Sequence, residues 1–165
     1  MKTLVVFYSR TGCTRTVAQA LAARLDAVIE ELRETTDRSG VAGYLRAGRD
    51  AGMRRPADLL PVACQPAAFD LTIVATPVWA FTMCPAVRTW LKREAVNIRR
   101  VAFVATQGGS GAERTFRHME EIMGRPPVAR LALIDKNVRA QSCEGQFTAF
   151  ADTCCGAAER VEGGR

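Results

Sequence analysis

The chain has 165 residues, of which 48% are hydrophobic and 24% are charged, and 23 Lys and Arg against 17 Asp and Glu give a formal net charge of +6. This balance excludes disordered, collagen-like and fibrous proteins. A chain of this length can bury a core without disulfides or metals, so we expect one domain over residues 1–162, with residues 163–165 as a frayed end. No segment reaches the roughly 20 continuous apolar residues of a membrane helix and no signal peptide is apparent, which favours a cytoplasmic protein without a membrane span.

Apolar segments alternate with helical patterns along the chain. The apolar residues 4–8 end at a polar loop, residues 9–14, after which Val17, Leu21 and Leu25 recur at helical spacing. Further strands are expected near residues 27–29, 69–76, 101–106 and 128–134, and further helices near residues 40–53, 84–95, 111–124 and 144–161. Strands that alternate with helices require parallel neighbours, so we predict a doubly wound α/β domain with a five-stranded parallel sheet.

The first loop, residues 9–14, has the composition of an anion-binding site. Ser9, Thr11 and Thr14 supply three hydroxyls, and Gly12 permits a tight turn before the helix. The free backbone amides and the dipole of a helix N-terminus both favour negative charge. An ordinary helix cap needs only one Ser or Thr, so three hydroxyls around a glycine indicate phosphate binding.

Other phosphate-binding motifs do not fit this loop. The sequence Gly-x-x-x-x-Gly-Lys-Ser/Thr of nucleotide-hydrolysing proteins is absent, and so is the three-glycine dinucleotide motif. A low-molecular-weight tyrosine phosphatase needs a cysteine nucleophile at the start of the loop, where this chain has Ser9.

Two more loops follow the third and fourth predicted strands, at the edge of a parallel sheet where ligands bind. Trp79 and Phe81 lie in the segment after residue 76, where they suit a flat ring ligand or cover the core beneath the loop. Residues 106–111 are rich in glycine, which would bring the backbone close to a ligand, although alone they indicate only a flexible turn.

The cysteines and the single histidine do not form a metal-binding pattern. The six cysteines contain no Cys-x-x-Cys pair, and His118 has no histidine partner. We therefore expect reduced thiols and no metal site. His118 lies in a helical stretch and is expected on the surface of that helix.

Arginine supplies most of the positive charge and clusters over residues 38–55 and 88–100. Such clusters attract nucleic acid, acidic proteins or small anions, but they also occur on solvated helix faces. Neither cluster has the interleaved aromatic residues of single-strand binders, so nucleic acid is not the expected partner.

Together the three loops resemble those of the flavodoxin family, and the resemblance covers almost the whole chain. It implies a sheet in the order 2-1-3-4-5 and FMN as the cofactor. For the FMN phosphate it assigns Ser9, Arg10, Thr11, Gly12, Cys13 and Thr14. For the ribityl chain and the flavin ring it assigns Thr76, Pro77, Val78, Trp79, Ala80, Gln107, Gly108, Gly109, Ser110 and Gly111. Because redox work is done by the flavin, no catalytic side chain is expected.

The expected function is therefore that of an FMN-binding flavoprotein in electron transport or in NAD(P)H-linked oxidoreduction. Electron-carrier flavodoxins are usually acidic, whereas this chain has a net charge of +6. The basic charge leaves two options open, an FMN-dependent NAD(P)H oxidoreductase and an electron carrier with an acidic redox partner. The alternative from another class is a non-redox binding module that uses the arginine clusters to hold an acidic partner or nucleic acid.

Overall fold

The computed structural model describes residues 1–35, 48–53 and 55–162. Of the helix predicted over residues 40–53, the described part is helical over residues 48–52, and residues 40–47 lie outside the described ranges. The predicted frayed end, residues 163–165, also lies outside them. Within the described ranges, no helix is long and apolar enough to cross a membrane.

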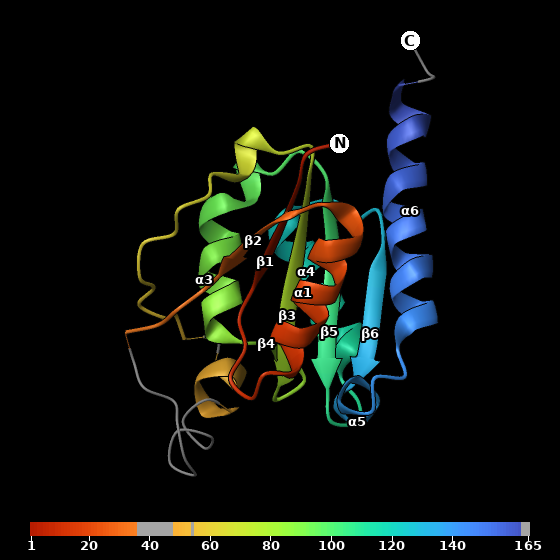
Figure 1. Cartoon of the computed structure of the whole chain (residues 1–165). Coiled ribbons are helices and arrows are strands. Elements are labelled where there is room, and N and C mark those ends of the chain that lie inside the picture. Colours follow the sequence, from red (N-terminus) through yellow and green to blue (C-terminus); the bar gives the residue numbers. More distant parts are fainter. Residues whose placement is uncertain (36–47, 54, 163–165) are drawn as a thin grey trace.

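A parallel sheet forms the centre of the domain (Figure 1). Its strands run in the order β2-β1-β3-β5-β6, and each neighbouring pair is parallel. The two-residue strand β4 pairs only with β3, in antiparallel orientation, so the predicted order 2-1-3-4-5 is confirmed for the five parallel strands. The strands are β1 (Thr3–Phe7), β2 (Val28–Glu31), β3 (Leu71–Trp79), β4 (Thr82–Met83), β5 (Val101–Gln107) and β6 (Arg130–Ile134).

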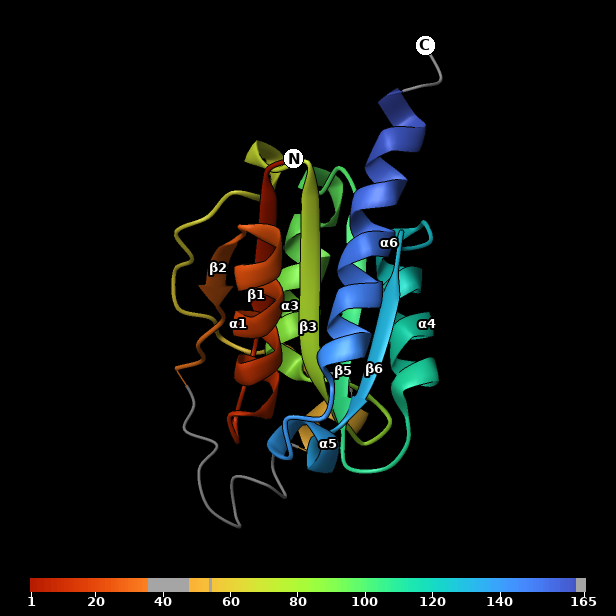
Figure 2. The ribbon, with the colours of Figure 1, turned by 45° about the vertical axis from the view of Figure 1, so that its right-hand side comes forward.

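Helices cover both faces of this sheet, as expected for a doubly wound fold (Figures 1 and 2). One face carries α1 (Cys13–Leu25) and α6 (Glu144–Glu162), with the short α5 (Asp135–Arg139) at the lower end of the sheet. The other face carries α3 (Pro85–Glu94) and α4 (Ala112–Met123). Two short 3-10 helices, Pro66–Ala68 and Ala95–Asn97, complete the described elements.

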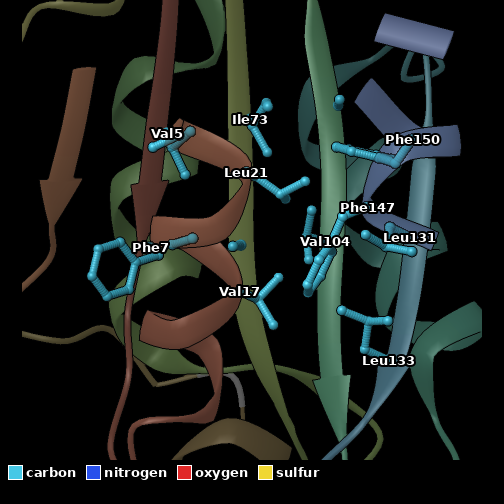
Figure 3. Close-up of a cluster of buried hydrophobic side chains, with 14 of the residues drawn as sticks. Val5, Phe7, Val17, Leu21, Ile73, Val104, Leu131, Leu133, Phe147 and Phe150 are labelled. Carbon is cyan, nitrogen blue, oxygen red and sulfur yellow. The ribbon is translucent and has the colours of Figure 1, made fainter. Parts of the chain in front are cut away.

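Each face of the sheet has its own hydrophobic core, because successive strand residues point to opposite faces. In β1, Val5 and Phe7 belong to the core under α1 and α6, whereas Leu4 and Val6 belong to the core under α3 and α4. Figure 3 shows the first core, in which side chains of α1 and α6 meet those of the sheet. Burial on both faces explains why the inner strands β1, β3 and β5 are mostly apolar, whereas the edge strand β2 contains Glu30 and Glu31 and has no buried residue.

The structure corrects the extent of the third strand. Residues 77–79 were predicted to lie in a loop, but β3 continues to Trp79 and then turns back into β4. Val78 pairs with Met83 and Trp79 pairs with Thr82, so the loop is a tight hairpin. This hairpin places part of the predicted site on regular strand structure.

Candidate functional site

A cavity of about 410 Å³ opens at the edge of the sheet where the parallel strands end. Its volume lies within the range of roughly 300–1,000 Å³ that is typical of small-molecule sites. All three predicted loops contribute to its wall. The lining residues are Arg10, Thr11, Thr14, Gly48, Pro77, Val78, Trp79, Ala80, Thr106, Gly108 and Asp135.

The first loop makes a tight turn into α1. The Gly12 N–H donates to Ser9 Oγ over 3.1 Å, and Gly12 has a φ of 94°, in the left-handed region that favours glycine. Helix α1 begins at Cys13, and its first turn contains no acidic residue. The helix amides without intrahelical acceptors and the positive end of the helix dipole therefore meet no carboxylate from that turn.

Two buried hydroxyls join this loop to the neighbouring strand end. Thr14 Oγ1 and Thr106 Oγ1 lie 2.8 Å apart, and both side chains line the cavity. Because one hydrogen bond uses only one of the two hydroxyl protons, the other proton remains for an acceptor outside this pair. The pair is thus a donor site next to the first turn of α1.

The hairpin between β3 and β4 forms the apolar part of the wall. Its two turn residues, Ala80 and Phe81, have φ values of 48° and 60°. Two successive left-handed residues in a two-residue hairpin loop are the pattern of a type I′ turn, which usually contains Asn or Gly. Each non-glycine residue in this region costs roughly 1 kcal/mol or more, so the surroundings must hold the turn in place.

Gly111 allows this hairpin to lie close to the start of α4. Gly111 precedes α4 and has a φ of 112°. A Cβ atom at this position would lie 2.9 Å from Val78 Cγ1 and 3.2 Å from Phe81 Cα. Gly111 was assigned to the flavin from the sequence. The close packing of the hairpin also requires glycine at this position.

An aromatic pair supports the wall from β1. Trp79 is half-buried and lines the cavity, and its ring meets that of Tyr8 edge to face, with centroids 5.5 Å apart and an interplanar angle of 87°. Phe81, by contrast, is 54% exposed at the tip of the hairpin. Of the two aromatics in this segment, Trp79 is the one that forms part of the cavity.

No protein-family model matches the chain, and no curated protein matches it. Solved structures do match. A flavoprotein from Lactobacillus acidophilus in complex with FMN superposes with a TM-score of 0.70 at 20% identity, covering 86% of this chain and 98% of that chain. A putative flavoprotein from Bacteroides uniformis gives a TM-score of 0.72 at 18% identity, covering 85% and 96%. An NADH:FMN oxidoreductase in its apo form gives a TM-score of 0.55 at 16% identity, covering 92% of this chain and 87% of that chain. The chain has a flavodoxin-like fold.

In this flavodoxin-like domain, eight of the residues that the sequence assigned to FMN line the cavity: Arg10, Thr11, Thr14, Pro77, Val78, Trp79, Ala80 and Gly108. The other eight assigned residues do not line the cavity, and three of them bond to backbone amides of the protein. Ser9 closes the first turn, and Cys13 is buried in the core. Thr76 Oγ1 accepts from the Cys84 N–H, and Gln107 Oε1 accepts from the Ala112 N–H at the start of α4. Gly12 and Gly111 supply backbone conformations, and Gly109 and Ser110 are exposed.

Three lining residues were not assigned to FMN from the sequence: Gly48, Thr106 and Asp135. Thr106 begins the third predicted loop, whereas Asp135 follows β6, a strand end to which no site residue was assigned from the sequence. Asp135 Oδ1 is buried and has no hydrogen-bond partner among the described residues. Burial raises the pKa of Asp135, and the charge of Arg139 opposes this shift in part.

Proposed function

We propose that this flavodoxin-like protein binds FMN in the cavity and transfers electrons through it. The proposal rests on one observation, which is that a hydroxyl-rich helix N-terminus and an apolar, tryptophan-bearing wall line the same cavity. A phosphate binds to a helix N-terminus with hydroxyl donors, and a heterocyclic ring binds to an apolar, aromatic wall. A ligand that carries both groups satisfies both halves of the site.

The first loop would hold the phosphate. Arg10, Thr11 and Thr14 line the cavity there, beside the first turn of α1, which carries no acidic residue. Charged and hydroxyl donors together with helix amides match the oxygens of a phosphate dianion. The free proton of the Thr14 and Thr106 pair adds one more donor.

Asp135 fits the polyol part of the same ligand. Its Oδ1 atom is buried at the cavity without a hydrogen-bond partner among the described residues, and such an atom costs free energy until a donor arrives. A ribityl hydroxyl supplies that donor. The carboxylate would therefore orient the ribityl chain between the phosphate loop and the hairpin.

The hairpin would bind the flavin ring. Pro77, Val78, Trp79 and Ala80 provide an apolar surface with one large aromatic side chain. When bound, FMN supplies the one-electron and two-electron chemistry. The residues of the chain hold the ring, exclude water from one side of it and set its potential through the backbone groups and the dielectric around it.

The charge of the chain bears on its electron donor and acceptor. A net charge of +6 disfavours docking on the basic reductases that acidic carriers use. We therefore propose NAD(P)H or an acidic redox protein as the partner, in the cytoplasm. Consumption of NADH or NADPH by the FMN-loaded protein would identify the enzyme, and its absence would favour the carrier.

The non-redox alternative loses support at one of its two arginine clusters. Within residues 88–100, Arg88 is only 3% exposed, Arg93 pairs with Glu94, and Arg99 pairs with Asp70. Arg88 is therefore not part of an exposed cationic surface, and the charges of Arg93 and Arg99 are in part neutralised by carboxylates. Most of the other cluster, residues 38–55, lies outside the described ranges.

Titration of the purified protein into FMN tests the proposal. We expect quenching of the FMN fluorescence and a shift of its visible absorption bands, because the ring enters a partly apolar site. Orthophosphate should compete with FMN, since it occupies the first loop. If the FMN spectrum and fluorescence stay unchanged at protein concentrations in excess of the ligand, the proposed function is wrong.

A further inference from the structure

Three buried polar side chains connect the hairpin of the cavity to the two helices behind it. Arg88 of α3 donates from Nη2 to Thr82 Oγ1 over 2.8 Å. Thr82 Oγ1 in turn lies 2.8 Å from Nδ1 of His118 on α4. All three residues are at most 9% exposed, which corrects the expectation that His118 lies on the surface of its helix.

The chemistry of the three groups fixes one of the two hydrogen-bond directions. A guanidinium only donates, so the Thr82 oxygen accepts from Arg88. The Thr82 hydroxyl keeps one proton and a second lone pair, so it donates to an unprotonated His118 Nδ1 or accepts from a protonated one. In either tautomer, the Thr82 hydroxyl joins the side chain of α3 to that of α4.

Thr82 sits at the base of the strained turn. It pairs with Trp79 across the hairpin, and only Ala80 and Phe81 lie between these two residues. Arg88 Nη2 also approaches the carbonyl oxygen of Met83, at 3.4 Å, so it contacts both residues of β4. The hairpin tip thus has a fixed base although neither of its turn residues is glycine.

We propose that Arg88 and His118 are positioning residues that act through the Thr82 hydroxyl to hold the hairpin tip against the ring-binding side of the cavity. The proposal rests on the proposed function for the identity of the ring as a flavin. Neither Arg88 nor His118 lines the cavity, so their effect is transmitted through the hairpin. The network should matter for the ring and not for the phosphate, because the first loop lies on another strand.

Two substitutions at Thr82 test the network. Thr82→Val keeps the shape of the side chain and removes the hydroxyl, whereas Thr82→Ser keeps the hydroxyl. Two ligands serve as probes. Lumiflavin has the flavin ring but neither ribityl chain nor phosphate. Orthophosphate represents the phosphate, and its binding is measured by phosphorus NMR. We expect Thr82→Val to weaken lumiflavin binding about 10-fold, the equivalent of one average hydrogen bond, and to leave orthophosphate binding unchanged. Thr82→Ser should stay within about 2-fold of the unmodified protein for both probes, because its hydroxyl remains.

Thr89→Val is the matched control. Thr89 is the next residue of α3, and its hydroxyl accepts from the Ala57 N–H over 2.9 Å, so the control also removes one structural hydrogen bond. It should lower thermal stability without changing lumiflavin affinity. His118→Asn offers an acceptor near the position of Nδ1 and should retain lumiflavin binding, whereas His118→Leu should lose it as Thr82→Val does.

The outcomes separate this inference from the proposed function. If Thr82→Val binds lumiflavin like the unmodified protein, or loses lumiflavin and orthophosphate equally, the positioning role is wrong. If the unmodified protein binds neither FMN nor lumiflavin, the proposed function fails. Amide hydrogen exchange at residues 79–82 then still decides whether the network holds the tip, because exchange should be faster in Thr82→Val than in Thr82→Ser. Equal exchange in the two variants overturns the inference.

Discussion

Thr14 and Thr106 place their hydroxyl oxygens 2.8 Å apart, although they are separated by 92 positions in the chain. Thr14 lies in the first turn of α1, and Thr106 lies near the end of β5. The contact joins the predicted phosphate loop to the start of the third predicted loop, at a residue that was not itself assigned to FMN. Both side chains are buried, yet both line the cavity.

We predict that Thr14→Val weakens FMN binding by roughly 10-fold to 100-fold, because it removes a hydroxyl that donates to an anion or keeps Thr106 in place. The affinity for riboflavin, which lacks the phosphate, should fall by a smaller factor. Fluorescence titration of both ligands measures the difference. Thr148→Val is the control, since Thr148 is exposed on α6, does not line the cavity and donates only to the carbonyl of Glu144 one turn earlier. Equal affinities of Thr14→Val and the unmodified protein for FMN would contradict the assignment of the first loop.

Gly111→Ala should destabilise the protein and displace the hairpin. The new Cβ would lie 2.9 Å from Val78 Cγ1, on a residue with a φ of 112°. We expect a loss of about 1–3 kcal/mol in the free energy of unfolding, measured in urea. Gly109→Ala, where no atom lies within 4 Å of the added Cβ, should have a much smaller effect. Similar losses in the two variants would show that the close contact does not constrain residue 111.

Asp135→Asn should raise stability at neutral pH and lower FMN affinity. Burial raises the pKa of Asp135 in the folded protein, so folding disfavours the charged form. The carboxyl therefore contributes most to stability below its unfolded pKa of 3.8, and this contribution is lost as the pH rises through the higher folded pKa. Asn removes this pH dependence, but as a neutral group it accepts a weaker hydrogen bond from a ribityl hydroxyl.

Thermal unfolding of Asp135→Asn from acid to neutral pH measures the change in stability. FMN titration at neutral pH measures the change in affinity. The gain in melting temperature should shrink as the pH falls. Asp152→Asn on the exposed surface of α6 provides the control and should change neither quantity. A variant that binds FMN as tightly as the unmodified protein would remove Asp135 from the ligand site.

Two adjacent cysteines should react very differently with alkylating reagents. All six cysteines are free, Cys154 is fully buried and Cys155 is exposed. Burial raises the pKa of Cys154 to about 12, so its thiolate is scarce at neutral pH. Peptide mass spectrometry after brief treatment with iodoacetamide should find Cys155 labelled and Cys154 unmodified. Equal labelling of both would show that the middle of α6 opens from the sheet.

The sequence predicted the sheet well because its signals are local. Within the first 25 residues, the apolar residues of β1 predict a strand, Gly12 predicts a turn, and the apolar residues at helical spacing predict α1. The hairpin was missed because Ala80 and Phe81 lack the Asn or Gly that marks such a turn. Its conformation depends instead on packing against Gly111, a contact between segments about 30 positions apart.

His118 shows why burial of a polar residue is hard to predict from one sequence. Its neighbour Arg117 and the nearby Glu121 are exposed, so the local pattern resembles a solvated face. One of the residues that contact His118, Thr82, belongs to β4, a two-residue strand without a sequence signal. Asp135 was missed for another reason, because it directly follows β6 and only the ends of the first, third and fourth predicted strands were considered.

The absence of glycine at Ala80 and Phe81 has a consequence for the speed and the cost of ligand capture. Glycine at these positions would let the free protein sample many loop shapes, and binding would have to select one of them. Ala and Phe sample fewer backbone conformations, but the left-handed one costs them free energy, so the pocket is preorganised because packing against Gly111 holds the turn in this shape before a ligand binds. The protein should therefore take up its ring ligand with little change in hairpin shape, by a route in which the cavity exists before the ligand arrives.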